Sequence, residues 1–271
     1  NRDRTQPDPP GDVAAADNRA AAAEAAEVAR DDNLVNEMAA IDGVTIPPSA
    51  AIDQVLTALL AMTRSAVDLA KDAVYAFIDQ DSTLAGKLAK QESQIDQAQH
   101  DIMEYLVKLT RRNLSEGQSA IIPDLMHCVN DIERIGDRAI NIFDLIDNLR
   151  ATQQDFSPGA LQEIREIERF INETGGMLID GIFRNDHGTI DKVIKRCGEI
   201  SQTTTRFELN HEARLHSRDC SVENGVIYVE LLANLERMAA HLENLAERAH
   251  SMLDHRMSFQ KDQKKTAPNV K

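Results

Sequence analysis

Residues 125–149 constrain the fold most, because two helical patterns are superimposed on this stretch. Polar and mainly acidic residues recur at steps of three and four, namely Asn130, Glu133, Asp137, Asn141 and Asp144. Such a ridge is either the solvated flank of an amphipathic helix or part of a binding site. Beside it, apolar residues follow the same steps and form one stripe of a helix that packs against other helices. They are Leu125, Cys128, Ile132, Ile135, Ala139, Ile142, Ile146 and Leu149.

Turn signals divide residues 50–257 into six amphipathic helices, and no convincing strand pattern is present. Ser, Asp, Asn, Gly and Pro cluster at 80–82, 115–117, 156–159, 185–188 and 216–221, where we expect the chain to turn. Ser157 is a good N-cap for the fourth helix, and Pro158 suits its first position. Short connections of this kind join antiparallel neighbours.

The sixth helix repeats the third when it is shifted by 103 positions. Residues 235–238 then match residues 132–135, and Asn244 matches Asn141, but Ala240 stands where the third helix has Asp137. The repeat predicts an all-α fold of two tandem antiparallel three-helix bundles, over 50–153 and 157–257. We expect residues 1–49 to be a flexible or partly helical linker, and residues 258–271 to be a basic tail.

The charge balance excludes some partners. Asp and Glu number 45 against 30 Lys and Arg, a formal charge of −15 that repels phosphate backbones and argues against nucleic acid. Cations or a basic protein surface suit it better. The three cysteines form no Cys-x-x-Cys pair, so we expect free thiols in a reducing, cytoplasmic compartment. No run approaches the roughly 18 apolar residues of a membrane span, and the start at Asn1 suggests a portion excised from a longer chain.

Carboxylates on different helices come out level in this arrangement, since positions at equal distance from a short turn lie at the same height. A turn near residue 115 sets Glu92 level with Asp137 and Asp96 level with Glu133. The two acids of each helix are four residues apart, about 6 Å along the axis and on one face. The candidate metal ligands of the first bundle are Asp68, Asp72, Glu92, Asp96, Glu133 and Asp137, and those of the second bundle are Glu173, Glu199 and Glu236.

So many level carboxylates repel one another unless something neutralises them. A hard or borderline cation such as Mg, Mn, Ca or Fe would do so, in preference to a thiolate-type zinc site. Alternatively, Arg134 and Arg237 pair with some of these acids and solvent screens the rest. The pair Asp68 and Asp72 is the least secure, because it flanks its apolar stripe on the opposite side.

Other catalytic and metal motifs fail on geometry. His211 and His216 are five positions apart on a helix and face about 140° away from each other, unlike the histidines of a zincin. Two Glu-x-x-His motifs, 208–211 and 247–250, resemble those of di-iron bundles, but level counting separates them by roughly 29 Å. We therefore expect each histidine to be exposed or hydrogen-bonded. No nucleophile with a supporting base is evident, so we expect no enzyme.

The sequence of residues 131–142, Asp-Ile-Glu-Arg-Ile-Gly-Asp-Arg-Ala-Ile-Asn-Ile, closely resembles the signature helix of PhoU proteins. Residues 235–238 and 244–247 look like its second copy, and the tandem of three-helix bundles is also the PhoU architecture. The resemblance covers about residues 50–256. In that family, acid-x-x-x-acid motifs hold multinuclear metal clusters, which by resemblance maps onto Glu133, Asp137, Glu92 and Asp96. The cofactor would be Fe, Mn, Mg or Zn.

The resemblance also implies a function. His211-x-x-Arg214 and the diverged second repeat look most like the PhoU-like domains at the C-terminus of bacterial sodium/phosphate cotransporters. We therefore expect a cytoplasmic regulatory module, tethered to the inner face of the membrane, whose partner is a phosphate transporter membrane domain in cis or in trans, or a phosphate sensor kinase. The alternatives are a free-standing phosphate-signalling PhoU regulator and a metal-free helical scaffold, each compatible with a homo-oligomer.

Overall fold

The computed structural model describes residues 46–266 of the chain, with side chains described as far as residue 254. Within this part the chain is helical throughout and forms no strand, as the sequence predicts. Six long helices and one short 3-10 helix follow one another, and most of the expected N-terminal linker lies outside the described residues. They are α2 (Pro48–Asp79), η1 (Ser82–Leu84), α3 (Ala85–Thr110), α4 (Glu116–Thr152), α5 (Pro158–Arg184), α6 (His187–His216) and α7 (Val222–Thr266).

The helix ends follow from local side-chain chemistry. Ser115 caps α4 through a reciprocal capping box with Gln118, and Ser157 caps α5 ahead of Pro158. Asp186 caps α6 by accepting a hydrogen bond from the backbone N–H of Thr189. α7 instead continues past residue 257, where we expected the second bundle to end, because residues 258–266 contain neither Gly nor Pro to stop it.

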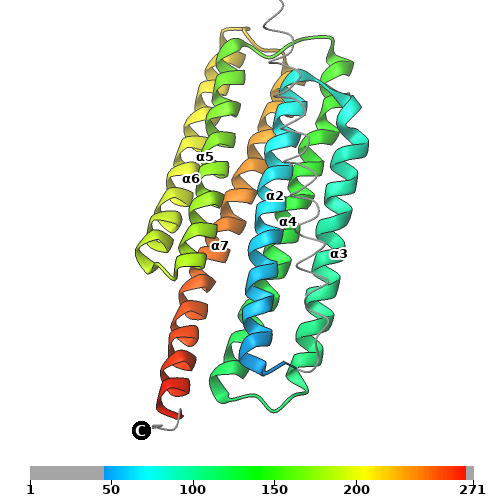
Figure 1. Ribbon diagram of the computed structural model, residues 1–271. Helices are drawn as coiled ribbons and strands as arrows, with labels where there is room; N and C mark the ends of the chain where they lie inside the picture. Colours follow the sequence, from blue (N-terminus) through cyan, green and yellow to red (C-terminus); the bar gives the residue numbers. More distant parts are fainter. Residues whose placement is uncertain (1–45, 267–271) are drawn as a thin grey trace, which may run out of the picture.

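Consecutive helices run antiparallel and form two groups of three (Figure 1). α2, α3 and α4 pack together, and so do α5, α6 and α7. The two groups join along α4 with α7, the most extensive helix pair of the fold, and along α2 with α5. The repeated helices of the sequence thus lie against each other in the middle of the molecule.

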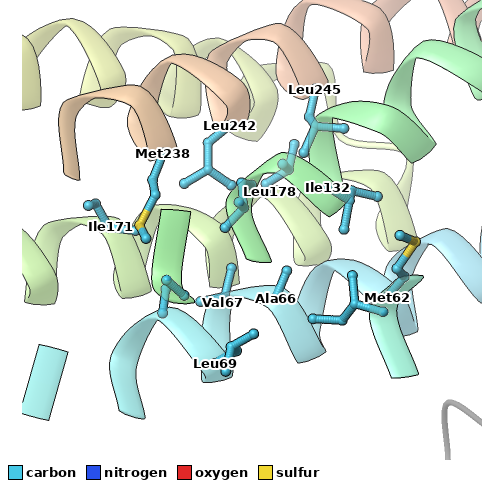
Figure 2. Close-up of a cluster of buried hydrophobic side chains, with 14 of the residues drawn as sticks. Met62, Ala66, Val67, Leu69, Ile132, Ile171, Leu178, Met238, Leu242 and Leu245 are labelled. Carbon is cyan, nitrogen blue, oxygen red and sulfur yellow. The ribbon is translucent and has the colours of Figure 1, made fainter. Parts of the chain in front are cut away.

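One continuous hydrophobic core extends through both bundles. Figure 2 shows side chains from α2, α4, α5 and α7 meeting in this core. They include Met62 and Val67 of α2, Ile132 of α4 and Leu242 of α7. Close approach of α2 and α5 depends on Gly175, where an added Cβ would lie only 2.6 Å from a methyl carbon of Val67. The two bundles therefore approach each other closely at this point.

A buried ionic network reinforces the α4–α7 contact. Asp131 on α4 is 5% exposed and accepts hydrogen bonds from Arg248 at 2.8 Å and Asn244 at 3.3 Å. Nδ1 of His241 lies 2.9 Å from the same carboxylate. The 103-residue repeat places Asn234 of α7 in the position that Asp131 holds in α4. Asn234 lines a cavity of about 450 Å³ with Arg138 and other polar residues, so the two halves of this interface differ chemically.

Candidate metal centre

Three of the predicted ligands meet on the surface of the first bundle. Glu92 and Asp96 lie one turn apart on α3, and Asp137 lies opposite them on α4. One carboxylate oxygen from each falls within 4.8 Å of the other two. This spacing allows a single cation to contact all three oxygens with small side-chain adjustments. The turn near residue 115 set Glu92 level with Asp137, and these two carboxylates do lie close together.

Electrostatic strain marks the same cluster. Burial raises the pKa of Glu92, and the negative charges of Asp96 and Asp137 raise it further. Burial also raises the pKa of Asp96, with a further contribution from Asp137. The pKa of Glu133 is raised by burial and then by Asp137 and Asp96, while Arg134 and His241 act in the opposite direction. Glu133 is therefore repelled electrostatically by the clustered carboxylates. A bound cation would offset the repulsion among these acids.

The acids of α2 lie outside this group of three. Asp72 forms an ion pair with Lys87 of α3 at 3.2 Å. A carboxylate that already has a cationic partner is a poorer metal ligand than an uncompensated one. Asp68 lies one turn earlier on α2 and is likewise not one of the three clustered residues. Their part in metal binding stays a prediction.

The predicted ligands of the second bundle already form ion pairs or hydrogen bonds with neighbouring side chains. Arg196 of α6 lies 2.8 Å from Glu173 of α5 and 3.6 Å from Glu199, so one guanidinium bridges two of the three predicted ligands. Glu236 of α7 accepts a hydrogen bond of 2.7 Å from Ser201. The acids of the second set thus already have partners within the bundle, and their part in metal binding stays a prediction.

Two polar clusters of the second bundle, around Glu163 and around His250, were not predicted from the sequence. Glu163 of α5 accepts two hydrogen bonds from Arg214 of α6, at 2.8 and 3.1 Å, and one from Tyr228 of α7. His211 packs against the Tyr228 ring and is only 3% exposed, so of the two expected states, exposed or hydrogen-bonded, the exposed one does not apply to it. His250 is hydrogen-bonded as expected, but its partner is another histidine, His187. Spacings of four residues between His and Asp were the available signal for this second pair.

The cysteines agree with the expectation of free thiols. None of the three forms a disulfide. Burial raises the pKa of Cys128 and of Cys197 to about 12. Both thiols are therefore poor nucleophiles and poor metal ligands at neutral pH.

Fold and site together define an all-helical protein of two three-helix bundles, with a cluster of carboxylates on one bundle surface. Residues 59–146, which extend from α2 through α3 to α4, match the family model described as the PhoU domain. This segment is therefore similar to the PhoU domain. The matched segment includes Glu92, Asp96, Glu133 and Asp137.

Two relatives match most of the chain. The phosphate-specific transport system accessory protein PhoU homolog of Pseudomonas aeruginosa is 27% identical over 206 residues, which cover 73% of this chain and 82% of the relative. The protein of the same description from Pseudomonas putida is 27% identical over 221 residues, covering 79% of this chain and 83% of the relative. These matches extend beyond the PhoU domain model into the second bundle.

Solved structures share the fold. The crystal structure of the phosphate transport system regulatory protein PhoU from Streptococcus pneumoniae superposes with a TM-score of 0.68 at 17% identity, covering 77% of this chain and 97% of that one. PhoU from Pseudomonas aeruginosa gives 0.61 at 22% identity, covering 76% and 98%. The predicted two-bundle architecture is therefore confirmed. Within the described part of the chain, no helix is both long enough and apolar enough to span a bilayer.

Proposed function

We propose that this protein is a non-enzymatic, cytoplasmic regulator of phosphate uptake that acts on a phosphate-specific transport system. The main support is the PhoU domain over residues 59–146, together with relatives described as accessory proteins of such systems. Its formal charge of −15 suits a basic patch on a partner protein, either the transporter membrane domain or a sensor kinase.

The relatives favour an accessory regulator over a domain of a sodium/phosphate cotransporter. The chain covers 82% and 83% of the length of the two accessory proteins. A match over more than four fifths of each relative's length supports a similar free-standing role. This support is stronger than the support that the diverged second repeat gives to a transporter-linked role. Regulation in trans is accordingly the form of the proposal that we adopt.

Complementation tests the regulatory role. The chain would be expressed in a Pseudomonas aeruginosa strain that lacks its own PhoU homolog and contains a phosphate-starvation reporter. We expect the chain to restore repression of the reporter in phosphate-rich medium. An unrepressed reporter despite normal expression of a folded chain would contradict the proposal. Crosslinking in the same strain would then distinguish the transporter from the kinase as the bound partner.

We further propose that Glu92, Asp96, Asp137 and Glu133 bind a metal ion that stabilises this regulator. The support is geometric and electrostatic: three oxygens lie within 4.8 Å, and the pKa values of Glu92 and Glu133 are raised by burial and by neighbouring negative charges. Oxygen ligands favour Fe, Mn or Mg, and Zn is also compatible with them. The alternative is a metal-free scaffold whose acids are screened by solvent.

Metal analysis separates these alternatives. Untagged protein purified without chelator would be analysed by mass spectrometry for Fe, Mn, Mg and Zn, and thermal unfolding would be recorded with each ion. We expect bound metal in the wild type and its loss in Asp96→Asn. Asp147→Asn, an exposed acid on α4, is the control. No bound metal together with no change in unfolding temperature would contradict the metal proposal and leave the complementation result unaffected.

A further inference from the structure

Two histidines from different helices lie in contact at one end of the second bundle. His187 is the first residue of α6, and His250 lies on α7. Their rings stack with centroids 5.1 Å apart and planes inclined by 22°. The two Nδ1 atoms are 2.8 Å apart, the distance of a hydrogen bond. The pair is therefore joined through its Nδ1 atoms.

The opposite ring nitrogens face carboxylates. Nε2 of His250 lies 3.0 Å from Asp191 of α6, and Nε2 of His187 lies 3.6 Å from Asp254 of α7. Each aspartate is four residues after a histidine on its own helix, and it faces the histidine of the other helix. A carboxylate beside Nε2 favours the N–H form of that nitrogen, which leaves Nδ1 without a proton in a neutral ring.

Two unprotonated Nδ1 atoms at 2.8 Å would repel each other through their lone pairs. Either a hydrogen bond, in which Nδ1–H of one ring donates to Nδ1 of the other, or a metal ion bound by both nitrogens relieves this repulsion. The carboxylates of Asp186, Asp191 and Asp254 surround the start of α6 and offset the unfavourable effect of the helix dipole on a cation there. The histidine side chains are 33% and 29% exposed, so an ion can reach them from solvent.

We propose that His187 and His250 form a second metal site, which takes a borderline transition-metal ion such as Zn²⁺ or Cu²⁺. Imidazole nitrogen suits these ions better than it suits Mg²⁺ or Ca²⁺. A Zn–N bond of about 2.0–2.1 Å with tetrahedral angles separates two ligand nitrogens by roughly 3.3 Å, so a small rotation of the rings admits the ion.

Asp191 and Asp254 complete this site in one of two positions. In the present geometry Asp191 accepts from Nε2–H of His250 at 3.0 Å, as carboxylates do beside histidines that bind metal, and Asp254 lies 3.6 Å from Nε2 of His187, beyond hydrogen-bond distance. Both side chains are 71% exposed, and rotation brings either one into the metal's own coordination shell. Water fills any remaining position. The site uses α6 and α7 only, so it is independent of the carboxylate cluster on α3 and α4 and of the proposed role in phosphate uptake.

Zinc titration of untagged full-length protein tests the proposal. We expect His187→Ala and His250→Ala each to weaken Zn²⁺ binding at one site at least tenfold, measured by competition with a chromophoric chelator. Asp191→Asn should weaken binding about tenfold, the usual effect of losing a carboxylate behind a ligating histidine. His216→Ala, at the far, exposed end of α6, is the control and should bind as the wild type does. Asp137→Asn should also leave this binding event unchanged.

Copper spectroscopy gives a readout that a structural role would not alter. With one equivalent of Cu²⁺, the electron paramagnetic resonance spectrum should show nitrogen coupling from two imidazoles, which His250→Ala should reduce to that of a single ring or none. If both histidine variants bind Zn²⁺ as the wild type does, or if the copper spectrum shows oxygen ligands alone, the proposal is overturned and the pair shares a proton instead.

Discussion

The carboxylate of Asp131 on α4 lies 2.8 Å from the guanidinium of Arg248 on α7, and this ion pair joins the two bundles at a buried point. Burial alone would raise the pKa of Asp131. Hydrogen bonds from His241 and Asn244, together with the charge of Arg248, lower the pKa overall. The carboxylate is therefore stabilised in its ionised form, and the contact between the repeated helices depends on that charge.

We expect Asp131→Asn to lower the free energy of unfolding by about 2 kcal/mol at pH 7, because it removes the charged acceptor of the partly buried Arg248 guanidinium. Urea unfolding followed by circular dichroism measures the loss. Asp147→Asn on the same helix is the control and should change stability by no more than about 0.5 kcal/mol, since Asp147 is exposed. Equal stabilities of the two variants would show that the network contributes little.

The lowered pKa of Asp131 also predicts a pH dependence. Its folded pKa lies below the unfolded value of about 3.9, so its contribution is complete above that value and is lost as pH falls through the folded pKa. The stability difference between the wild type and Asp131→Asn should therefore shrink as the pH falls below about 4. Unfolding curves at a series of pH values test this, and a difference that does not depend on pH would contradict it.

Adjacent glycines on α5 should respond to alanine with opposite signs. At Gly175 the new Cβ would lie 2.6 Å from Val67, so Gly175→Ala should destabilise the protein by about 1–3 kcal/mol by forcing α2 and α5 apart. At Gly176 no atom lies within 4 Å of an added Cβ, so Gly176→Ala should stabilise the helix by up to about 1 kcal/mol. Thermal unfolding of both variants tests the pair, and destabilisation by Gly176→Ala would show that the helix is packed otherwise.

The sequence predicts the helices well because each signal is local. Apolar periodicity identifies the six helices, and Ser115 and Ser157 mark where two of them begin. The positions of Glu92, Asp96 and Asp137 follow from the same information, because short turns fix the height of antiparallel neighbours. Turn counting gives the height of a residue but not the partner of its side chain, and Asp72 of α2 pairs with Lys87.

Contacts between the bundles could not be predicted in the same way. The pairing of α4 with α7 brings Asp131 to Arg248 across more than a hundred residues, and no short turn relates them. The contact of His187 with His250 differs in this respect, because both residues lie in the second bundle and the short turn at 216–221 relates α6 to α7. Arg196 shows a second limit: its long side chain bridges Glu173 and Glu199, and which acids an arginine reaches depends on rotamers rather than on spacing.

Glu168 on α5 should be a destabilising residue at neutral pH. It is 6% exposed, and its Oε1 atom is buried without a hydrogen-bond partner. Burial raises its pKa, although Lys71 and Arg169 act in the opposite direction. A raised pKa means that stability falls as pH rises from the unfolded value through the folded one. We expect Glu168→Gln to stabilise the protein at pH 7 by about 1 kcal/mol and to have little effect at pH 4.

A matched substitution on the same helix provides the control for Glu168. Glu166→Gln removes a charge from the same helix at a partly exposed position that pairs with Arg206, so it should change stability by less than about 0.5 kcal/mol at either pH. If Glu168→Gln destabilised the protein at pH 7, Lys71 would be shown to compensate the buried charge.

The carboxylate cluster should weaken the metal-free protein. Glu133 and Asp137 are four apart on α4, and the raised pKa of Glu133 reflects burial and then the charge of Asp137. The cost of these like charges appears as pH rises through the carboxyl range. Asp137→Asn should therefore stabilise the metal-free protein above about pH 5, by about 0.5 kcal/mol, the usual cost of a like-charge pair at this spacing.

The same substitution should remove stabilisation by metal. A ligand at ten times its dissociation constant stabilises a protein by about 1.4 kcal/mol, so Mn²⁺ at that ratio should raise the unfolding free energy of the wild type by that amount and leave Asp137→Asn nearly unchanged. Calorimetric unfolding with and without Mn²⁺ measures both effects, with Asp147→Asn as the control that should behave as the wild type. Equal responses of all three proteins to Mn²⁺ would place the metal elsewhere, whereas a less stable metal-free Asp137→Asn would show that repulsion within the cluster is already compensated.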